Sequence, residues 1–263
     1  MPDDIVIRPA KPKDAGDIVE IIRSGMEPDL LPMLIYGCSG IRSYVADQIC
    51  ASQCCSDAIY YVACSYEKPV GCVEFRLLPS TLFLNYISIL PEYRAMGLGR
   101  KMLAKSISLS TQIIHPQNMI LDVMGINTKA RKWYANLGFS HDHTQVWYVM
   151  PLDTAGHSEK AFISGYPQAK ACHERFGFSQ FRVITSTAEY TVGMMGENWF
   201  RITQPEAMAD DALHGTLLKI DPSRRLLAIL PEDIKPSNST DNVLCVASNH
   251  RLIANIELLV QRI

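Results

Sequence analysis

The stretch that decides the fold is "PEYRAMGLGRKM", residues 91–102. It places two glycines, Gly97 and Gly99, one residue apart, just before a pattern with helical spacing. Glycine has no Cβ, so its backbone adopts positive φ and approaches a ligand closely. The first turn of a helix adds unpaired N–H groups and the positive end of the macrodipole. The stretch therefore predicts an anion cradle, with the side chains of Arg94 and Arg100 nearby.

The spacing of these glycines narrows the choice of phosphate ligand. A dinucleotide fingerprint needs a third glycine where Met102 stands. The P-loop pattern needs Gly-Lys-Ser/Thr, which is absent. A lone Gly-x-Gly also occurs in tight turns that bind nothing, so this alternative stays open.

The first 152 residues alternate between strand and helix patterns. Strands are indicated by β-branched or alternating apolar runs, at residues 4–10, 58–66, 70–78, 81–90, 118–124 and 144–152. Helices are indicated by apolar spacing and terminal signals, at residues 13–25, 40–55, 100–114 and 127–139. The predicted order is βαα-βββ-α-β-α-β.

Two motifs resemble those of the GCN5-related N-acetyltransferases, the GNAT superfamily. Residues 94–99, "RAMGLG", resemble its Arg/Gln-x-x-Gly-x-Gly/Ala signature, and residues 127–139, "NTKARKWYANLGF", resemble Asn-x-x-Ala-x-x-x-Tyr-x-x-x-Gly-Phe. The resemblance covers residues 1–152. It implies an α/β fold, a GNAT-like mixed sheet with flanking helices. Residues 153–263 would form a smaller α/β C-terminal region, read as a partial, degenerate GNAT-like repeat.

The resemblance implies acetyl-CoA as co-substrate and assigns residues to it. The pyrophosphate would lie on the loop formed by Arg94, Ala95, Met96, Gly97, Leu98, Gly99 and Arg100. The strand of residues 81–90 would splay from that of residues 118–124, so that the pantetheine arm pairs with the backbone around Ile87 to Ile89. Asn127 would contact the pantetheine, or serve only as a helix N-cap.

The resemblance also implies a direct transfer in which Tyr134 protonates the leaving thiolate. A phenol is a neutral proton donor near pH 7, and the alternative is that Tyr134 simply packs on its helix face with Ala130 and Leu137. The general base stays open because Asn85 stands where many relatives carry a glutamate on the central strand. Glu74 and Glu92 are the candidates, and Ser88 is a weaker one that would hold a water.

A short segment in the second half of the chain resembles a segment in the first half. Residues 129–140, "KARKWYANLGFS", and residues 168–179, "QAKACHERFGFS", both place alanine eight residues before Gly-Phe-Ser. In this alignment His173 replaces Tyr134, and no phosphate loop precedes the copy. We expect residues 153–167 to be a linker or loop. The copy should not bind CoA, and would wall the acceptor cleft or mediate dimerisation.

Composition limits the class of protein. The 263 residues carry a formal net charge of −2, which gives no electrostatic case for a nucleic-acid partner. No apolar run reaches the roughly 18–20 residues of a membrane span, and the N-terminus lacks a signal-peptide core. A cytoplasmic protein with reduced thiols is expected. The "CASQCC" cluster, Cys50 to Cys55, lacks a second ligand pair, so no metal site is expected.

Three functions remain to be compared. The leading one is an acetyl-CoA-dependent N-acetyltransferase acting on a small-molecule or peptide amine, with a homodimer as one possible assembly. The second is a non-catalytic acyl-CoA-binding or regulatory module, which Asn85 favours. The third is a structural α/β domain, which the joint presence of both motifs disfavours. The acceptor cleft is expected around residues 27–53.

Overall fold

The computed structural model describes residues 5–52, 57–152, 161–235 and 242–263. The chain forms two compact units, and each draws on separate segments of sequence. Unit 1 comprises Met1–Glu27, Arg42–Asp142 and His250–Ile263, and unit 2 comprises Pro28–Ile41 and His143–Asn249. The boundary between these two units lies at residues 142/143, and residues 250–263 belong to unit 1. The domain boundary expected at residue 152 stays a prediction.

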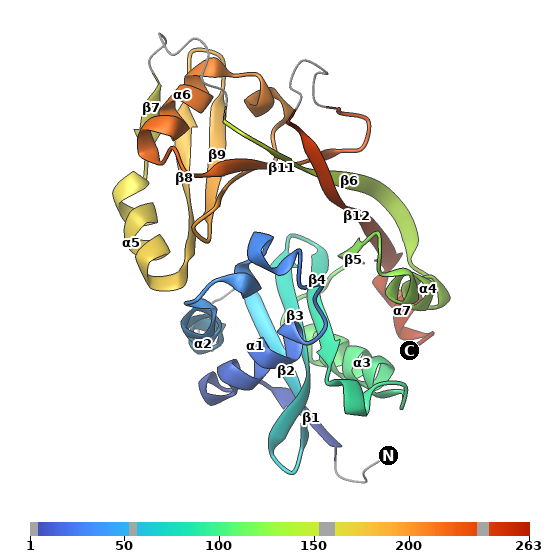
Figure 1. Cartoon of the computed structure of the whole chain (residues 1–263). Coiled ribbons are helices and arrows are strands. Elements are labelled where there is room, and N and C mark those ends of the chain that lie inside the picture. Colours follow the sequence, from blue (N-terminus) through green and yellow to red (C-terminus); the bar gives the residue numbers. More distant parts are fainter. Residues whose placement is uncertain (1–4, 53–56, 153–160, 236–241) are drawn as a thin grey trace. The chain divides into compact units, whose positions relative to one another are not determined.

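Unit 1 is built on a mixed sheet (Figure 1). Its strands lie in the order β1 (Ile5–Pro9), β2 (Ala58–Ser65), β3 (Lys68–Leu78), β4 (Thr81–Ile89), β5 (Asn118–Met124) and β12 (Leu244–Asn255). The first four are antiparallel neighbours, and β5 runs parallel to β4. A parallel neighbour needs a crossover, which the helix between β4 and β5 provides.

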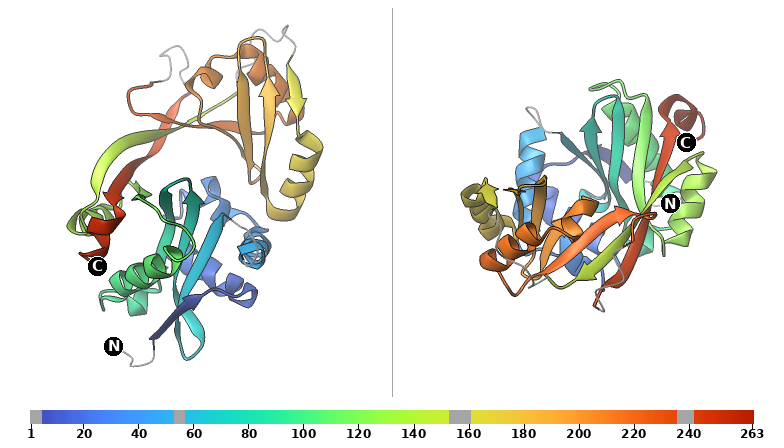
Figure 2. Two further views of the ribbon diagram at one scale, coloured as in Figure 1. Left: turned by 180° about the vertical axis from the view of Figure 1, so that it is seen from behind. Right: turned by 90° about the horizontal axis from the view of Figure 1, so that it is seen from above.

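The helices of unit 1 cover both faces of this sheet (Figures 1 and 2). They are α1 (Ala15–Arg23), α2 (Ile41–Ser52), α3 (Leu98–Ser110), α4 (Thr128–Asn136) and α7 (Ile256–Val260). Helices α3, α4 and α7 share one apolar core with alternate residues of the strands, among them Phe75, Leu84 and Leu121. Helix α1 packs against β3 and β4 on the opposite face, where the Ser88 hydroxyl donates to the carbonyl of Ile21.

Unit 2 has its own core, and its strands belong to the same 12-stranded sheet order as those of unit 1. Its strands lie in the order β6 (Ser140–Met150), β11 (Arg225–Pro231), β10 (Trp199–Ile202), β9 (Glu189–Met195), β8 (Phe178–Ile184) and β7 (Phe162–Ser164). Its helices are α5 (Tyr166–Phe176) and α6 (Asp211–Ile220). Strands β6 and β12 have residues in both units.

Single turns of 3-10 helix complete the elements. They are η1 (Pro12–Asp14), η2 (Leu31–Met33), η3 (Ile35–Gly37), η4 (Pro91–Tyr93) and η5 (Pro205–Met208).

Unit 2 repeats the topology of unit 1. Strands β7 to β10 are antiparallel neighbours, and α6 crosses over to place β11 parallel to β10. In unit 1, β1 to β4, α3 and β5 follow the same path. The expected α/β class, with a degenerate repeat, is therefore confirmed.

The residue alignment behind that expectation is wrong. It matched α4 with α5, but α4 follows the parallel strand β5, whereas α5 lies between β7 and β8, the positions of β1 and β2. His173 is therefore no counterpart of Tyr134. The shared Gly-Phe reflects a common helix ending, since Gly138 and Gly177 have φ of 93° and 80°.

The second half also holds elements that the sequence did not indicate. Residues 153–167 were expected to be a linker, yet β7 and the start of α5 lie within them. Helix α6 and strand β10 were not predicted. Among the described residues, no helix is long and apolar enough to cross a membrane. Of the "CASQCC" cysteines, Cys54 and Cys55 lie outside the described residues.

Candidate cofactor and transfer site

The glycine loop forms a backbone cradle in front of α3. Ala95 and Gly97 both have left-handed backbones, with φ of 63° and 75°. Alternating conformations of this kind turn successive N–H groups towards one side and form an anion-binding nest. Gly97 is the N-cap of α3, and no side chain caps this helix. A Cβ on Gly97 would meet no atom within 4 Å, so the space above the loop is open.

Arg94 holds the loop in place instead of facing an anion. Its Nε donates to the carbonyl of Ile89 at 2.7 Å, and its Nη2 lies 3.4 Å from the carbonyl of Ser24. These contacts join the loop to the end of β4 and to the end of α1. The backbone of the loop is therefore the part that is presented to a ligand, and the Arg100 side chain is exposed beside it.

Strands β4 and β5 separate immediately below the loop. They pair only from Thr81–Asn118 to Leu84–Leu121, although β4 continues to Ile89. A β-bulge at Asn85 marks the point of separation, because Glu74 pairs with Tyr86 and Phe75 with Leu84. Residues 85–89 thus offer one unpaired backbone edge towards β5. Five residues at about 3.3 Å each give an edge of about 16 Å for an extended arm.

Asn127 caps the helix that follows β5. Its Oδ1 accepts a hydrogen bond from the backbone N–H of Ala130 at 3.0 Å. The capping role considered from the sequence is therefore present. Contact of Asn127 with a pantetheine arm stays a prediction.

Tyr134 lies in the core of unit 1, in the same apolar cluster as Val123 of β5 and Ile87 of β4. Its side chain is 7% exposed, and its ring lies 4.9 Å from Trp133 and 5.5 Å from Phe139, between centroids. Burial raises the pKa of its phenol well above the usual range. No described residue hydrogen-bonds its hydroxyl, and the raised pKa keeps the phenol neutral near pH 7.

Glu74 occupies a buried ion pair. Its Oε1 accepts hydrogen bonds from Arg76 Nε at 3.0 Å and from Asn85 Nδ2 at 2.8 Å, and the residue is 0% exposed. Both hydrogen bonds already engage this carboxylate within the protein. This geometry weighs against Glu74 as the general base, which stays an untested assignment.

The two other base candidates lie elsewhere. Glu92 is exposed on the turn η4. Ser88 already donates its hydroxyl proton to Ile21 of α1 at 2.8 Å. The sequence analysis missed Arg76, although it lies two residues after Glu74 on the same face of β3, which is a readable signal.

The sequence analysis also missed the pair formed by Asp122 of β5 and Arg251 of β12. Their atoms Oδ2 and Nη2 are 2.7 Å apart. The two residues are separated by 129 positions, so no local pattern could have indicated the contact.

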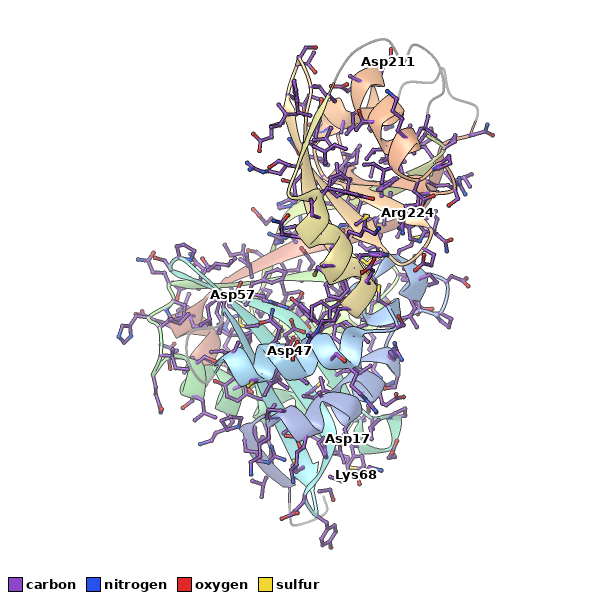
Figure 3. All side chains as sticks on the ribbon, turned by 90° about the vertical axis from the view of Figure 1, so that its left-hand side faces the viewer. Asp17, Asp47, Asp57, Lys68, Asp211 and Arg224 are labelled. Carbon is purple, nitrogen blue, oxygen red and sulfur yellow. The ribbon has the colours of Figure 1, made fainter. Side chains whose placement is uncertain are left out.

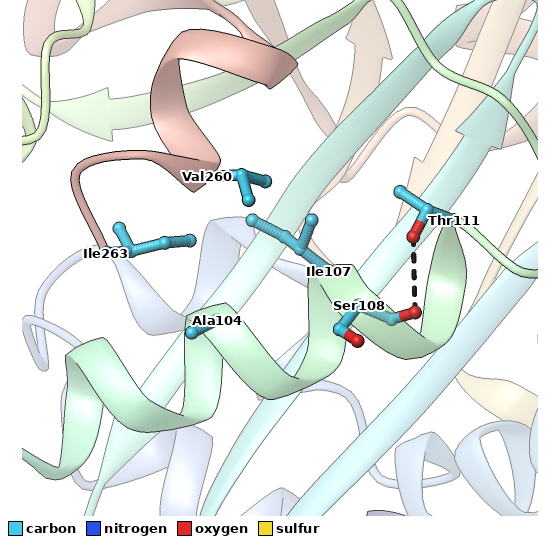
Figure 4. Close-up of a pocket in the computed structure, with 6 residues that line it drawn as sticks. All are labelled: Ala104, Ile107, Ser108, Thr111, Val260 and Ile263. Carbon is cyan, nitrogen blue, oxygen red and sulfur yellow. Dashed lines mark hydrogen bonds between the residues drawn. The ribbon is translucent and has the colours of Figure 1, made fainter.

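The hollow in Figure 4 lies away from this site. It has a volume of about 290 Å³ and lies between the second half of α3 and the C-terminal residues Val260 and Ile263. The glycine loop is at the other end of α3. Among the described residues, no group of three or more potential ligands could hold a metal ion.

A family comparison agrees with this geometry. The family model described as Acetyltransferase (GNAT) family matches residues 39–139, which include the cradle, the separated strands and Tyr134. These residues form a GNAT domain. Curated proteins gave no significant sequence match to the chain.

Solved structures extend the GNAT likeness to the whole chain. A putative acetyltransferase from Pyrococcus horikoshii is 14% identical, with a TM-score of 0.63, and the match covers 98% of this chain and 91% of that one. A tandem GNAT protein from the clavulanic acid biosynthesis pathway is 12% identical, with a TM-score of 0.64, over 96% and 98% of the two chains. A GCN5-related N-acetyltransferase from Sphaerobacter thermophilus is 12% identical, with a TM-score of 0.59, over 97% of each. At these identities the likeness shows the fold, a tandem of two GNAT-like units.

In unit 2, an aspartate side chain caps the N-terminus of α6, the helix that corresponds to α3. The segment between β10 and α6, residues 203–210, contains no glycine. Asp210 caps α6, because its Oδ1 accepts from the N–H of Leu213 at 2.9 Å. Its Oδ2 accepts hydroxyl hydrogen bonds at 2.7–2.9 Å, from Thr185, Thr187 and Tyr190. A carboxylate thus stands where the cradle of unit 1 is open, and Asp211 adds a second one at the start of α6 (Figure 3).

Proposed function

We propose that this chain is an acetyl-CoA-dependent N-acetyltransferase that moves an acetyl group directly to a small-molecule or peptide amine, in unit 1. The observation that carries the proposal is the open backbone nest at Ala95 and Gly97, directly above an unpaired edge of β4. A nest binds the pyrophosphate, and a free strand edge pairs with the amides of the pantetheine arm. Unit 2 lacks both features, since β10 ends at Ile202 and Asp210 caps α6.

The proposed chemistry is a single displacement. The amine nitrogen attacks the thioester carbonyl, a C–N bond forms and the C–S bond breaks. Unpaired N–H groups of β4 stabilise the negative charge that develops on the carbonyl oxygen. The thiolate takes a proton from Tyr134, the proton of the amine leaves through water or a base, and a proton returned from water restores the neutral Tyr134.

The proton donated to the thiolate and the proton lost by the amine are transferred on opposite faces of the sheet. Tyr134 lies in the core shared with α3, together with Leu121 and Val123 of β5. The acceptor must therefore approach from the other face, where β3, β4 and β5 present Glu74, Tyr86 and Asp122.

The alternative function is a non-catalytic acyl-CoA-binding or regulatory module. The observation that favours it is the pairing of Glu74 with Arg76 and Asn85, which leaves no free carboxylate at the bulge. Release of CoA thiol with a panel of amines separates the two. Turnover supports the transferase, and tight CoA binding without turnover supports the module.

The first experiment is thermal unfolding with and without excess acetyl-CoA. A ligand at about 100 times its dissociation constant stabilises the folded state by about 2.7 kcal/mol. We expect this shift in the wild type and its loss in Gly97→Glu, because the carboxylate would occupy the cradle.

Gly165→Glu is the matched control. Gly165 is also the N-cap of a helix, in unit 2, with φ of 77° and nothing within 4 Å of an added Cβ. Both variants place a non-glycine residue in a left-handed backbone conformation, which destabilises each by about 1–2 kcal/mol. Equal ligand shifts in the two variants would show that the loop of unit 1 is only a turn.

A further inference from the structure

Arg251 is fixed in one orientation within unit 1. Its Nε and Nη2 bind Asp122 Oδ1 and Oδ2 at 2.5 and 2.7 Å. Its guanidinium carbon lies 5.3 Å from the centroid of the Phe83 ring. The hydrogen bonds that Arg251 donates to Asp122 raise the pKa of Arg251 further, so the group is always charged. Because two hydrogen bonds to Asp122 and the Phe83 ring hold this guanidinium, the side chain has already lost most of its conformational freedom.

This pair lies at the point where β4 and β5 separate. Asp122 directly follows Leu121, the last residue of β5 that pairs with β4. Leu121 and Val123 point into the core with α3, so Asp122 points to the opposite face. That face is the one from which the amine must approach.

The reacting carbonyl belongs close to the same point. The nest follows the far end of β4, so an arm that starts there runs back along residues 89 to 85 towards the bulge. Its thioester then lies near the separation of the two strands. Asp122 and Arg251 flank this position from the acceptor side.

Arg251 has hydrogen-bond donors to spare. A guanidinium carries five N–H groups, and Asp122 engages only the Nε–Nη2 edge. In the described parts of the chain, Nη1 makes no hydrogen bond, although the Asp142 carboxylate also acts electrostatically on the guanidinium. The Nη1–Nη2 edge has the fork geometry that a carboxylate accepts, and the Arg251 side chain is 24% exposed.

Arg76 lies on the same face but has no comparable guanidinium edge available for a carboxylate. Its Nε and Nη2 bind Glu74, and its Nη1 faces Asp57 at 3.8 Å. Only 18% of its side chain is exposed.

We propose that Arg251 binds a carboxylate of the acceptor, so that the acceptor is a small amine that also bears a carboxylate, such as an α-amino acid. This inference rests on the proposed acetyl transfer to an amine. In such a molecule the amine is two bonds from the carboxylate carbon, so a carboxylate on Arg251 brings the amine to the separated strands.

The test compares matched ligands that differ only in the carboxylate. The pairs are leucine with isoamylamine, phenylalanine with phenethylamine, and lysine with cadaverine. Binding is measured by calorimetry on the full chain with CoA present and absent, and acetylation by thiol release. We expect the wild type to favour the amino acid of at least one pair by about 10- to 100-fold, the range for a charged hydrogen bond.

The variants are Arg251→Gln, Arg251→Lys and the control Arg182→Gln. Arg251→Gln should erase the preference by raising KM or Kd while kcat changes little, and Arg251→Lys should keep part of it. Arg182 pairs with Glu189 in unit 2, so Arg182→Gln loses a surface ion pair and should keep the preference. The unfolding temperature of each variant confirms that it is folded.

The outcomes separate this inference from the proposed function. No carboxylate preference in the wild type, or a preference that survives in Arg251→Gln, overturns the role of Arg251. A preference that depends on Arg251, without CoA binding or turnover, supports the carboxylate site while the transferase proposal fails. CoA binding and turnover without that preference leave the transferase proposal standing alone.

Discussion

At the residue scale, the site depends on a few backbone and side-chain positions whose conformations cost energy. Ala95 keeps a left-handed backbone although alanine disfavours it by about 1–2 kcal/mol. Such strain persists where the surroundings fix it, and here Arg94 ties the loop to Ile89 and Ser24. The strained loop, and Tyr134, whose hydroxyl bonds no residue in the described parts of the chain, are the features to test first.

Tyr134→Phe should lower kcat while leaving CoA binding unchanged. The variant removes only the hydroxyl, which supplies a proton to the thiolate, and general acids contribute about 10²- to 10⁴-fold. Unfolding stability should change little, since no described residue bonds this hydroxyl. Tyr190→Phe is the control: its hydroxyl donates to Asp210 at 2.9 Å, so stability should fall while kcat stays. Equal kcat in Tyr134→Phe and wild type would remove Tyr134 from the mechanism.

Asp210 should make the stability of the fold dependent on pH below about 4. Burial alone would raise the pKa of its carboxyl, but hydrogen bonds from Thr187, Thr185, Tyr190 and the N–H of Leu213 lower it below the usual 3.8. Protonation therefore favours the unfolded chain. The stabilisation is complete above about pH 4 and is lost as the pH falls through the folded pKa.

Asp210→Asn tests this pH dependence. We expect the variant to be less stable at pH 7 and to lose less stability between pH 5 and 2, measured by urea unfolding. Parallel curves for variant and wild type would show that Asp210 does not titrate in this way.

At the scale of elements, the last strand and helix of the chain complete unit 1. Leu252, Ala254, Ile256 and Leu259 lie in the same core as α3. The N–H of Ile256 donates to the carbonyl of Gln117 at 3.0 Å. The Arg262 side chain covers Gly138, where an added Cβ would collide with it. A sheet edge left open at β5 would expose these partners to water.

A chain ending at residue 152 should therefore fail to fold cooperatively. Each lost apolar side chain removes about 1.5–3 kcal/mol, against a total stability of about 5–15 kcal/mol for a domain. Circular dichroism melts and gel filtration of residues 1–152 check this, and adding a peptide of residues 242–263 should restore some structure. A monomeric 1–152 chain with a sharp melt would contradict the expectation.

At the scale of the whole molecule, two units share one topology but only one retains a cradle. In unit 1 the N-terminus of α3 is uncapped and β4 runs five residues past its pairing with β5. In unit 2 Asp210 caps α6, and β10 ends where β4 would separate. The repeat therefore keeps the scaffold of unit 1, while a side chain caps the helix that corresponds to α3.

Acetyl-CoA should accordingly bind once per chain. Isothermal titration should give a stoichiometry of one for the wild type and for Gly165→Glu, and no binding for Gly97→Glu. Two equivalents bound per chain would show that unit 2 retains a site despite Asp210.

The sequence by itself determined the cradle, most strands of unit 1 and the helix carrying Tyr134, because these depend on local spacing. Glycines before a helix and a cap such as Asn127 act within a few residues. The sequence did not predict the topology of unit 2, because short strands such as β7 and β10 have too few residues to show an alternating hydrophobic pattern.

Only the tertiary structure decided how the site is completed. It paired Glu74 of β3 with Asn85 of β4, and it brought Arg251 to Asp122 from 129 residues away. Such contacts follow from strand order and register, which no local pattern records. The physical reason is that a sheet joins residues by hydrogen bonding between strands, whatever their separation along the chain.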